Sequence, residues 1–362
     1  MRAVPFARAR PPLRVCLLLA LLPWLGACNP FSKAPSMMDE YVERVGRVLE
    51  VDAQLSPVPD AARMPRRRDR MLALPDLDMG ILDFLSLYGC ELQYVVGEKN
   101  SVLGRVMQPL NRLRYELRFI RSAQDCLPSV DDKDLRTTVK DAIAAKQKSL
   151  PLAIWNATWG SPDIESLFSL AQGTYPVRKP GDTGGNPVSD LAREAAQMDA
   201  AVQRLLAGKL DVSLEFAGDV HQRWQAESRA GQLIRSAVLL TARLDDATGL
   251  IQRRLDGRPL CLNQKPNPQA TVVRNVFFNI YIGKVQPYLA DVRRARDALM
   301  VPMAALAEAQ SAVMPATFRP WYERYLALTG ETSVWQGLDR AMADHTRAWQ
   351  ALLGQCGMRP GA

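Results

Sequence analysis

Apolar residues recur every three or four positions along most of this chain, which is the spacing of one buried face of an α-helix. The last such pattern is the clearest, because Ser333 precedes it as an N-cap and Gly354 follows it as a stop. The pattern predicts an all-α protein, a multi-helix bundle with long antiparallel helical hairpins that disulfides clip together. We expect its helices to begin near Ser36 and to cover residues 78–106, 110–124, 149–159, 188–207, 211–228, 230–256, 271–308 and 333–353.

Prolines mark the breaks between these helices. A loop with four prolines follows the first helix and ends at Pro75. We expect Ser149 and Pro151 to open a short helix, and Pro287 to kink or divide the pattern over 271–308. Residues 272–282 are β-branched and aromatic enough for a strand, but no partner strand is visible, so we expect them to be helical.

Residues 173–187 are rich in glycine and proline and form the best linker candidate. On either side of it we expect an N-terminal helical region over residues 36–172 and a C-terminal helical region over residues 188–362. A chain of this length allows one large or two medium domains.

The first 27 residues have the pattern of a signal peptide, a basic stretch followed by an apolar core too short to span a bilayer. Their end, Leu25-Gly26-Ala27-Cys28, resembles the bacterial lipobox, in which the cysteine is acylated and becomes the mature N-terminus. We expect Cys28 to carry the anchor and residues 28–35 to form a tether. Because Asn29 stands where an aspartate usually retains lipoproteins at the inner membrane, we expect the outer membrane, facing the periplasm. An ordinary secretory signal with a chance cysteine is the alternative.

Removal of residues 1–27 removes four arginines and no acids, so the formal net charge falls from +8 to +4. So mild a charge gives no case for nucleic-acid binding. No further apolar run reaches the roughly 18 residues of a spanning helix, so we expect contact with the membrane through the lipid alone. The oligomeric state stays open.

Four cysteines besides Cys28 remain in the mature chain, which suggests two disulfides in an oxidising periplasm. If helices 78–106 and 110–124 form an antiparallel hairpin that turns near residue 108, Cys90 and Cys126 lie at equal height, since each helix rises about 1.5 Å per residue. This favours pairing Cys90 with Cys126 and Cys261 with Cys356. Free thiols are the alternative; a metal site is less favoured, since no C-x-x-C motif or paired histidine occurs.

Two arginine clusters are candidate partner surfaces. Arg114, Arg118 and Arg121 line one face of the predicted helix 110–124, where guanidinium groups suit carboxylates or phosphates. The alternative is a solvated face paired with acids of a neighbouring helix. The arginines within residues 66–70 suit anionic headgroups, or simply mark an exposed loop.

A third candidate is the pair of indoles at Trp155 and Trp159, one helical turn apart with the amide of Asn156 beside them. Such a pair suits a saccharide or a peptide. Buried packing is the alternative, because indoles are highly buried on average.

Catalytic signatures are missing from the sequence. It contains no G-x-S-x-G, H-E-x-x-H, Walker loop or dinucleotide fingerprint, so we expect no catalytic residue, metal or cofactor. Carboxylates that are distant in sequence and meet in space remain the alternative route to hydrolysis. His345 falls on the apolar stripe of the last helix, where we expect a hydrogen-bonded core histidine, and we expect His221 at the surface.

Several motifs carry a family resemblance. Beside the lipobox, the chain has PRRRDR at 65–70, LDFL at 82–85, a stretch from Cys90 to Gly104, RLRYELRF at 112–119 and WNAT at 155–158. Together they resemble the domain of unknown function 3080 family of uncharacterised proteobacterial lipoproteins. The likeness spans the signal and about the first half of the mature chain. It implies a helical periplasmic lipoprotein, with no active site to carry over.

We therefore favour a periplasm-facing outer-membrane lipoprotein that serves as a helical binding or adaptor module for an envelope partner. The partner would contact the arginine face of helix 110–124 or the region of Trp155. The alternative is a cell-wall or envelope hydrolase, or a saccharide binder, with a carboxylate site near Trp155 and Trp159.

Overall fold

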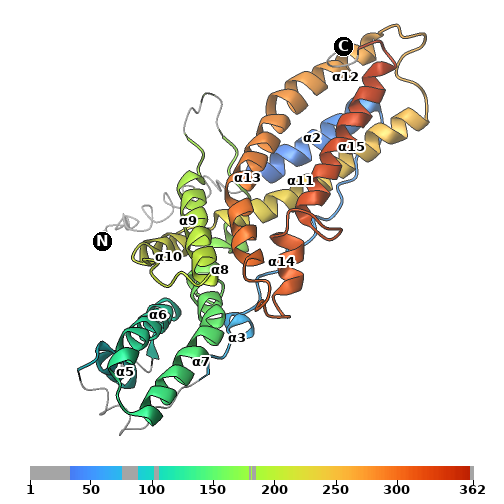
Figure 1. The fold of residues 1–362 in the computed structure, drawn as a ribbon. Helices are drawn as coiled ribbons and strands as arrows, with labels where there is room; N and C mark the ends of the chain where they lie inside the picture. Colours follow the sequence, from blue (N-terminus) through green and yellow to red (C-terminus); the bar gives the residue numbers. More distant parts are fainter. Residues whose placement is uncertain (1–32, 76–88, 102–105, 179–180, 182–184, 359–362) are drawn as a thin grey trace, which may run out of the picture.

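The computed structural model describes residues 33–75, 89–101, 106–178, 181 and 185–358, and within these ranges every regular element is a helix (Figure 1). The all-α prediction is confirmed. The predicted signal peptide and Cys28 lie outside the described residues. Within the described ranges, no helix combines the length and the apolar character that crossing a bilayer requires.

The molecule is elongated, and its larger end is a bundle around α11 (Figure 1). Helix α11 packs against α2, α13 and α15. Helix α12 continues through a π-helix, η6, into α13, so residues 272–282 are helical as predicted. The helices of this end are α2 (Lys33–Leu49), α11 (Arg229–Asp256), α12 (Pro268–Val276), η6 (Phe277–Val285), α13 (Gln286–Glu308), α14 (Arg319–Tyr325) and α15 (Val334–Gly354).

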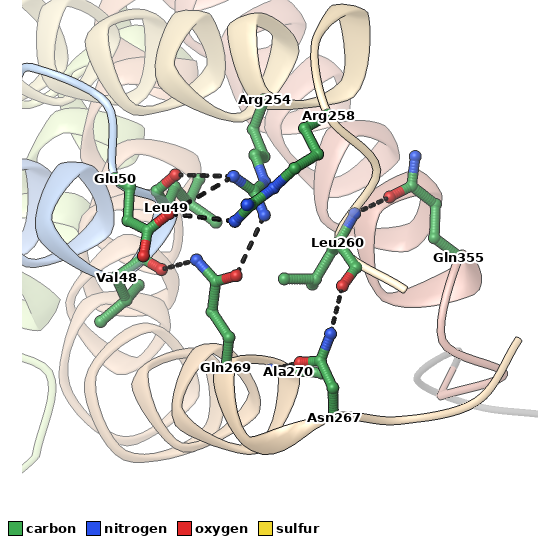
Figure 2. A network of polar contacts seen from close by, with 10 residues as sticks. All are labelled: Val48, Leu49, Glu50, Arg254, Arg258, Leu260, Asn267, Gln269, Ala270 and Gln355. Carbon is green, nitrogen blue, oxygen red and sulfur yellow. Dashed lines mark hydrogen bonds and ion pairs between the residues drawn. The ribbon is translucent and has the colours of Figure 1, made fainter. Parts of the chain in front are cut away.

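The tip of this bundle is tied by a polar network (Figure 2). Backbone carbonyls at the end of α2 have no partner within the helix, and two side chains supply it: Gln269 donates to the Val48 carbonyl (3.1 Å) and Arg254 to the Leu49 carbonyl (3.4 Å). Asn267 links the far side, capping α12 at the Ala270 amide (2.8 Å) and donating to the Leu260 carbonyl (2.7 Å). The end of α2 is therefore held by side chains from α11 and α12.

The opposite end is a smaller hairpin of helices, and α8, α9 and α10 lie between the two ends (Figure 1). Its first helix, α5, packs against α6, and α6 packs against α7. The remaining helices are α3 (Arg67–Arg70), α5 (Glu91–Asn100), α6 (Pro109–Cys126), η4 (Leu127–Ser129), α7 (Lys133–Thr158), α8 (Asp163–Leu167), η5 (Leu170–Gln172), α9 (Ser189–Leu206) and α10 (Ala217–Ala226).

Both predicted disulfides are present. Cys90 immediately precedes α5 and Cys126 ends α6, with their Cα atoms 5.6 Å apart. Cys261 and Cys356 join the loop after α11 to the end of α15, with Cα atoms 5.1 Å apart. Both predicted pairs are therefore confirmed, but the bounds of the first predicted helix are wrong: α5 covers Glu91–Asn100, with extended backbone at Cys90 and Ser101, and residues 76–88 and 102–105 lie outside the described ranges.

The predicted start of a short helix at Ser149 is wrong. Helix α7 begins sixteen residues earlier, where Asp132 accepts a hydrogen bond from the Leu135 amide (2.8 Å) as an N-cap. Pro151 lies inside this helix, where it removes one backbone donor. The buried side chains of Leu150, Ile154 and other residues of α7 offset that loss. Helix α2 likewise begins at Lys33 and not at Ser36.

The described part of the predicted linker, residues 173–178, 181 and 185–187, is anchored in the core. The side chain of Tyr175 is buried, and its amide donates to the Ser236 hydroxyl (2.8 Å) on α11. Its carbonyl accepts from the Tyr288 hydroxyl (2.9 Å) on α13. This segment therefore begins with a fixed contact to the larger bundle.

Candidate functional site

Two of the three arginines of the predicted face on α6 are engaged in contacts within the protein. Arg118 forms an ion pair with Glu98 of α5 (2.8 Å), and Arg114 donates to the Leu214 carbonyl (2.8 Å). Arg121 is exposed, and no hydrogen bond or ion pair ties it to another described residue. The pairing of Arg118 agrees with the alternative of a solvated face paired with a neighbouring helix.

Trp155 and Trp159 lie in the core and not on a surface. Both are fully buried, and their rings lie 5.3 Å from the ring of Phe318. The Trp155 indole donates to the Arg70 carbonyl (2.7 Å). Asn156 is also buried, and its side-chain amide binds the backbone of Leu72 twice. It accepts from the Leu72 N–H (2.8 Å) and donates to the Leu72 carbonyl (2.7 Å). The predicted ligand surface thus binds a segment of the chain itself, and neither indole face is open to a saccharide.

That segment belongs to a proline-rich connection, residues 51–75, which we call the strap. It leaves the tip of the bundle and runs back along α11, where the Ser56 amide donates to Asp246 (3.1 Å). Farther along, the Ala62 amide donates to the Tyr325 hydroxyl (2.7 Å) of α14. The strap then forms the single turn of α3 and docks on the end of α7.

Arg70 is the residue that fixes this docking. Its guanidinium is fully buried and donates to the carbonyls of Trp159 (2.5 Å), Ser161 (2.9 Å) and Pro65 (2.7 Å). It also forms an ion pair with Glu165 (2.8 Å). Burial lowers the pKa of Arg70, and Glu165 opposes that effect. Because the Trp159 carbonyl lies at the C-terminal end of α7, the cation also complements the helix dipole. The expectation of an exposed loop is therefore wrong for Arg70.

The other arginines of the strap line an open cleft of about 1080 Å³. The strap forms one wall of this cleft, and the segment from α8 to η5, together with α11, forms the other. We call it the arginine cleft. Its charged lining consists of five arginines and two acids, namely Arg63, Arg66, Arg67, Arg68, Arg235, Asp60 and Glu165.

The charge balance in the arginine cleft favours an anion. Glu165 is already paired with Arg70 beneath the cleft wall, so its negative charge is largely compensated. Arg235 donates only to the Leu170 carbonyl (3.3 Å), and no ion pair joins Arg63 or Arg66 to another described residue. Guanidinium groups in this state bind phosphate and carboxylate groups in bidentate fashion.

The opposite wall depends on a close approach of η5 to α11. A Cβ at Gly231 would overlap the carbonyl oxygen of Ser169, so only glycine permits this contact. Ser169 caps η5 through the Ala171 amide (3.4 Å). The approach places Ser169 and Ala171 in the cleft lining beside Arg235.

The two histidines differ from each other in their surroundings. His345 is a buried and fully hydrogen-bonded core residue, as predicted, between Tyr41 (2.6 Å) and Thr248 (2.9 Å). His221, which we expected at the surface, is buried, stacks on Trp224 and lies 3.3 Å from Asp163. Burial lowers the pKa of His221, and Asp163 opposes that effect.

The neighbourhood of His221 contains a serine, a histidine and an aspartate without the order of a catalytic triad. Ser161 donates to the same Asp163 oxygen (2.6 Å) that faces His221. A triad needs the imidazole between the hydroxyl and the carboxylate. In the ranges that the structure describes, no group of three or more histidines, cysteines or acids is arranged to hold a metal.

Sequence reasoning found part of the arginine cleft and missed part of it. The run from Arg66 to Arg68 was identifiable as a cluster. Arg63 and Arg235 were not, since Arg235 is 172 residues beyond Arg63 and occupies an ordinary exposed position of α11. Only the path of the strap along α11 brings them together.

The fold and the site define an all-helical protein with two disulfides and a cationic cleft. A family model for a protein of unknown function (DUF3080) matches residues 38–360, so the chain belongs to that family. The match includes the C-terminal half, beyond the extent of the motifs noted in the sequence. No curated protein and no solved structure matches the chain.

Proposed function

We propose that this protein is a binding module of the bacterial envelope, acylated at Cys28, held at the outer membrane and facing the periplasm. In this proposal an anionic envelope component binds in the arginine cleft. The lipobox Leu25-Gly26-Ala27-Cys28 supports the anchor and the compartment. The cleft supports the binding role.

The observation that carries the proposal is the surplus of guanidinium groups in one concave site. Five arginines face two acids there, and one of these acids is compensated by Arg70. Arg68 is paired with Asp69 (3.6 Å), but Arg63, Arg66 and Arg235 have no acid partner among the described residues. An anion that binds in the cleft supplies these guanidinium groups with one. An open cleft of about 1080 Å³ has room for an extended ligand with several charges.

The alternative of a hydrolase or saccharide binder at Trp155 and Trp159 finds no support in the geometry. Sugar stacking needs an exposed aromatic face, and both indoles are fully buried against Phe318 and Phe168. We therefore place the binding role at the arginine cleft and not at the two indoles.

The proposal is tested by photo-crosslinking in intact cells. A photoreactive residue replaces Ala171, which lines the arginine cleft, and in a separate strain it replaces Tyr94, which is 75% exposed on α5. We expect one defined adduct from position 171 and none from position 94, with identification by mass spectrometry. Labelling of wild-type protein by palmitate, and none of a Cys28→Ser variant, tests the anchor in the same strains.

Charge reversal shows whether the cleft itself holds the ligand. We expect Arg66→Glu combined with Arg235→Glu to abolish the adduct, because the pair reverses two exposed cleft charges that lack acid partners. Arg118→Glu with Arg121→Glu makes the same charge change on α6 and serves as the matched control. An adduct that survives in the cleft pair, or is lost equally in both pairs, contradicts the proposal.

A further inference from the structure

The arginine cleft lies near the point where the chain leaves the membrane anchor, and this position identifies a ligand. We propose that the cleft binds the phosphate groups of anionic lipid headgroups in the membrane to which Cys28 is attached. The inference rests on the proposed function and specifies its ligand. Three features support it: the register of α2 on α11, the length of the tether, and the cleft arginines that have no acid partner among the described residues.

Helices α2 and α11 lie side by side and run in the same direction. Asp39 forms an ion pair with Arg243 (2.5 Å), and near the other end Arg254 donates to the Leu49 carbonyl. The two contacts join residues 204 and 205 positions apart, so the register is constant along α2. Extended back to the start of α2, this register puts Lys33 level with about residue 237, within one helical turn of Arg235.

The strap brings Arg63 and Arg66 back to the same position along the axis of α11, near Arg235. Arg253 donates to the Asp52 carbonyl (3.1 Å), and Asp246 accepts from the Ser56 amide (3.1 Å), so the strap runs antiparallel to α11. Its later residues therefore approach the start of α11, where Arg63 and Arg66 join Arg235 in the cleft.

The tether is too short to place the start of α2, and the arginine cleft beside it, far from the bilayer. Five peptide units separate Cys28 from Lys33, and a fully extended chain of five residues spans at most about 18 Å. Helix α2 then carries the bundle tip away, since its 17 residues rise roughly 25 Å. The cleft end of α2 is therefore the end that remains within reach of the lipid surface.

The chemistry of the cleft agrees with this position. An anionic headgroup offers phosphate oxygens that accept bidentate hydrogen bonds from guanidinium groups. Lysines and arginines near an anionic membrane surface each contribute about 1 kcal/mol, which is about fivefold in binding. A site for an acidic protein segment needs no such position beside the anchor, so the tether length favours the lipid.

The test uses the mature chain with Cys28→Ser, exported behind a cleavable secretory signal so that no acyl chain holds it to a bilayer. It is mixed with vesicles of phosphatidylcholine alone, and with vesicles containing equal parts of phosphatidylcholine and phosphatidylglycerol, and the bound fraction is measured by flotation. We expect binding to the mixed vesicles only. Inorganic phosphate in competition shows whether a single free phosphate occupies the same groups.

Two pairs of substitutions locate the binding. Arg66→Gln with Arg235→Gln should lower the partition into mixed vesicles roughly 25-fold, at about fivefold per arginine. Arg118→Gln with Arg121→Gln removes the same charge from α6 and should change the partition into mixed vesicles by less than about threefold. All four side chains reach the surface, and circular dichroism checks that each variant is folded.

Three results overturn the inference. Equal losses in both pairs show attraction by net charge alone. Absence of vesicle binding, with an adduct at position 171 in cells that is identified as a small soluble anion, assigns the cleft to that anion. Absence of vesicle binding, with an adduct at position 171 in cells that is identified as a protein, assigns the cleft to an acidic protein segment and leaves the proposed function standing.

Discussion

At the scale of single residues, His345 is held in a neutral form by its neighbours. Its Nε2 atom faces the Trp349 indole N–H (3.0 Å), which can only donate, so Nε2 accepts and Nδ1 carries the proton toward Thr248 (2.9 Å). Protonation of Nε2 would set two N–H groups against each other in the core. Burial accordingly lowers the pKa of His345 to about 3.

This shift predicts a loss of stability in mild acid. The unfolded chain binds the histidine proton near its ordinary pKa of 6.5, and the folded chain does so only near 3. The contribution of His345 to stability is therefore complete above 6.5 and is lost as the pH falls from 6.5 toward 3. Between pH 7 and pH 5 the loss is roughly 2 kcal/mol.

Urea unfolding of wild type and His345→Gln at pH 5, 6 and 7 checks this. We expect the variant to be less stable at pH 7, and its free energy of unfolding to depend less on pH. His221→Gln is the matched control, and it should alter the pH slope less, because Asp163 opposes the effect of burial on that histidine. Parallel pH profiles for wild type and His345→Gln would show that another group is responsible.

At the scale of elements, α3 has too few residues to be stable as an isolated helix, and Arg70 holds it in place. Replacing Arg70 with methionine leaves the carbonyls of Trp159, Ser161 and Pro65 without their donor. Each buried group that loses its partner costs about 1–3 kcal/mol, so we expect Arg70→Met to lower the free energy of unfolding by about 4 kcal/mol. Arg68→Met removes a side chain that is 74% exposed and should change it by less than about 0.5 kcal/mol.

Limited proteolysis shows whether the effect of Arg70 includes the strap. We expect Arg70→Met to be cleaved within residues 51–75 under conditions that leave the wild type and Arg68→Met intact. The same susceptibility in all three proteins would show that Arg70 does not hold the strap.

The elements also show which features a sequence pattern can predict. The 3-4 spacing from Trp335 to Leu352 fixed the last helix closely, because the apolar stripe, the cap and the stop all agree locally. The sequence predicts only a fragment of α7, because Pro151 is typical of a helix start and the packing that outweighs its lost hydrogen bond is tertiary. The docking of Arg70 on α7 joins residues 85 and more positions apart, and no local pattern predicts it.

At the scale of the whole molecule, one disulfide lies in the larger bundle and the other in the smaller hairpin at the opposite end. Cys261–Cys356 closes a stretch of 95 residues within the larger bundle and ties the loop after α11 to the end of α15. Cys90–Cys126 holds α5, which packs against α6 at the far end of the molecule. The sequence favoured Cys90–Cys126 because an antiparallel hairpin brings these two cysteines to one height, and Cys261–Cys356 was the pair that remained. The unequal contributions of the two disulfides follow only from the packing.

We expect the two disulfides to stabilise different units. Cys261→Ser with Cys356→Ser should lower the global free energy of unfolding by about 5 kcal/mol, the chain-entropy value for a closed loop of this size. Cys90→Ser with Cys126→Ser should release α5 locally, with a smaller global loss, because α11 keeps its packing against α2, α13 and α15. Hydrogen exchange by segment, alongside urea unfolding, separates the two cases. Fast exchange confined to residues 91–100 in the second variant is the expected result, whereas equal global losses would mean that α5 and the larger bundle unfold as one unit.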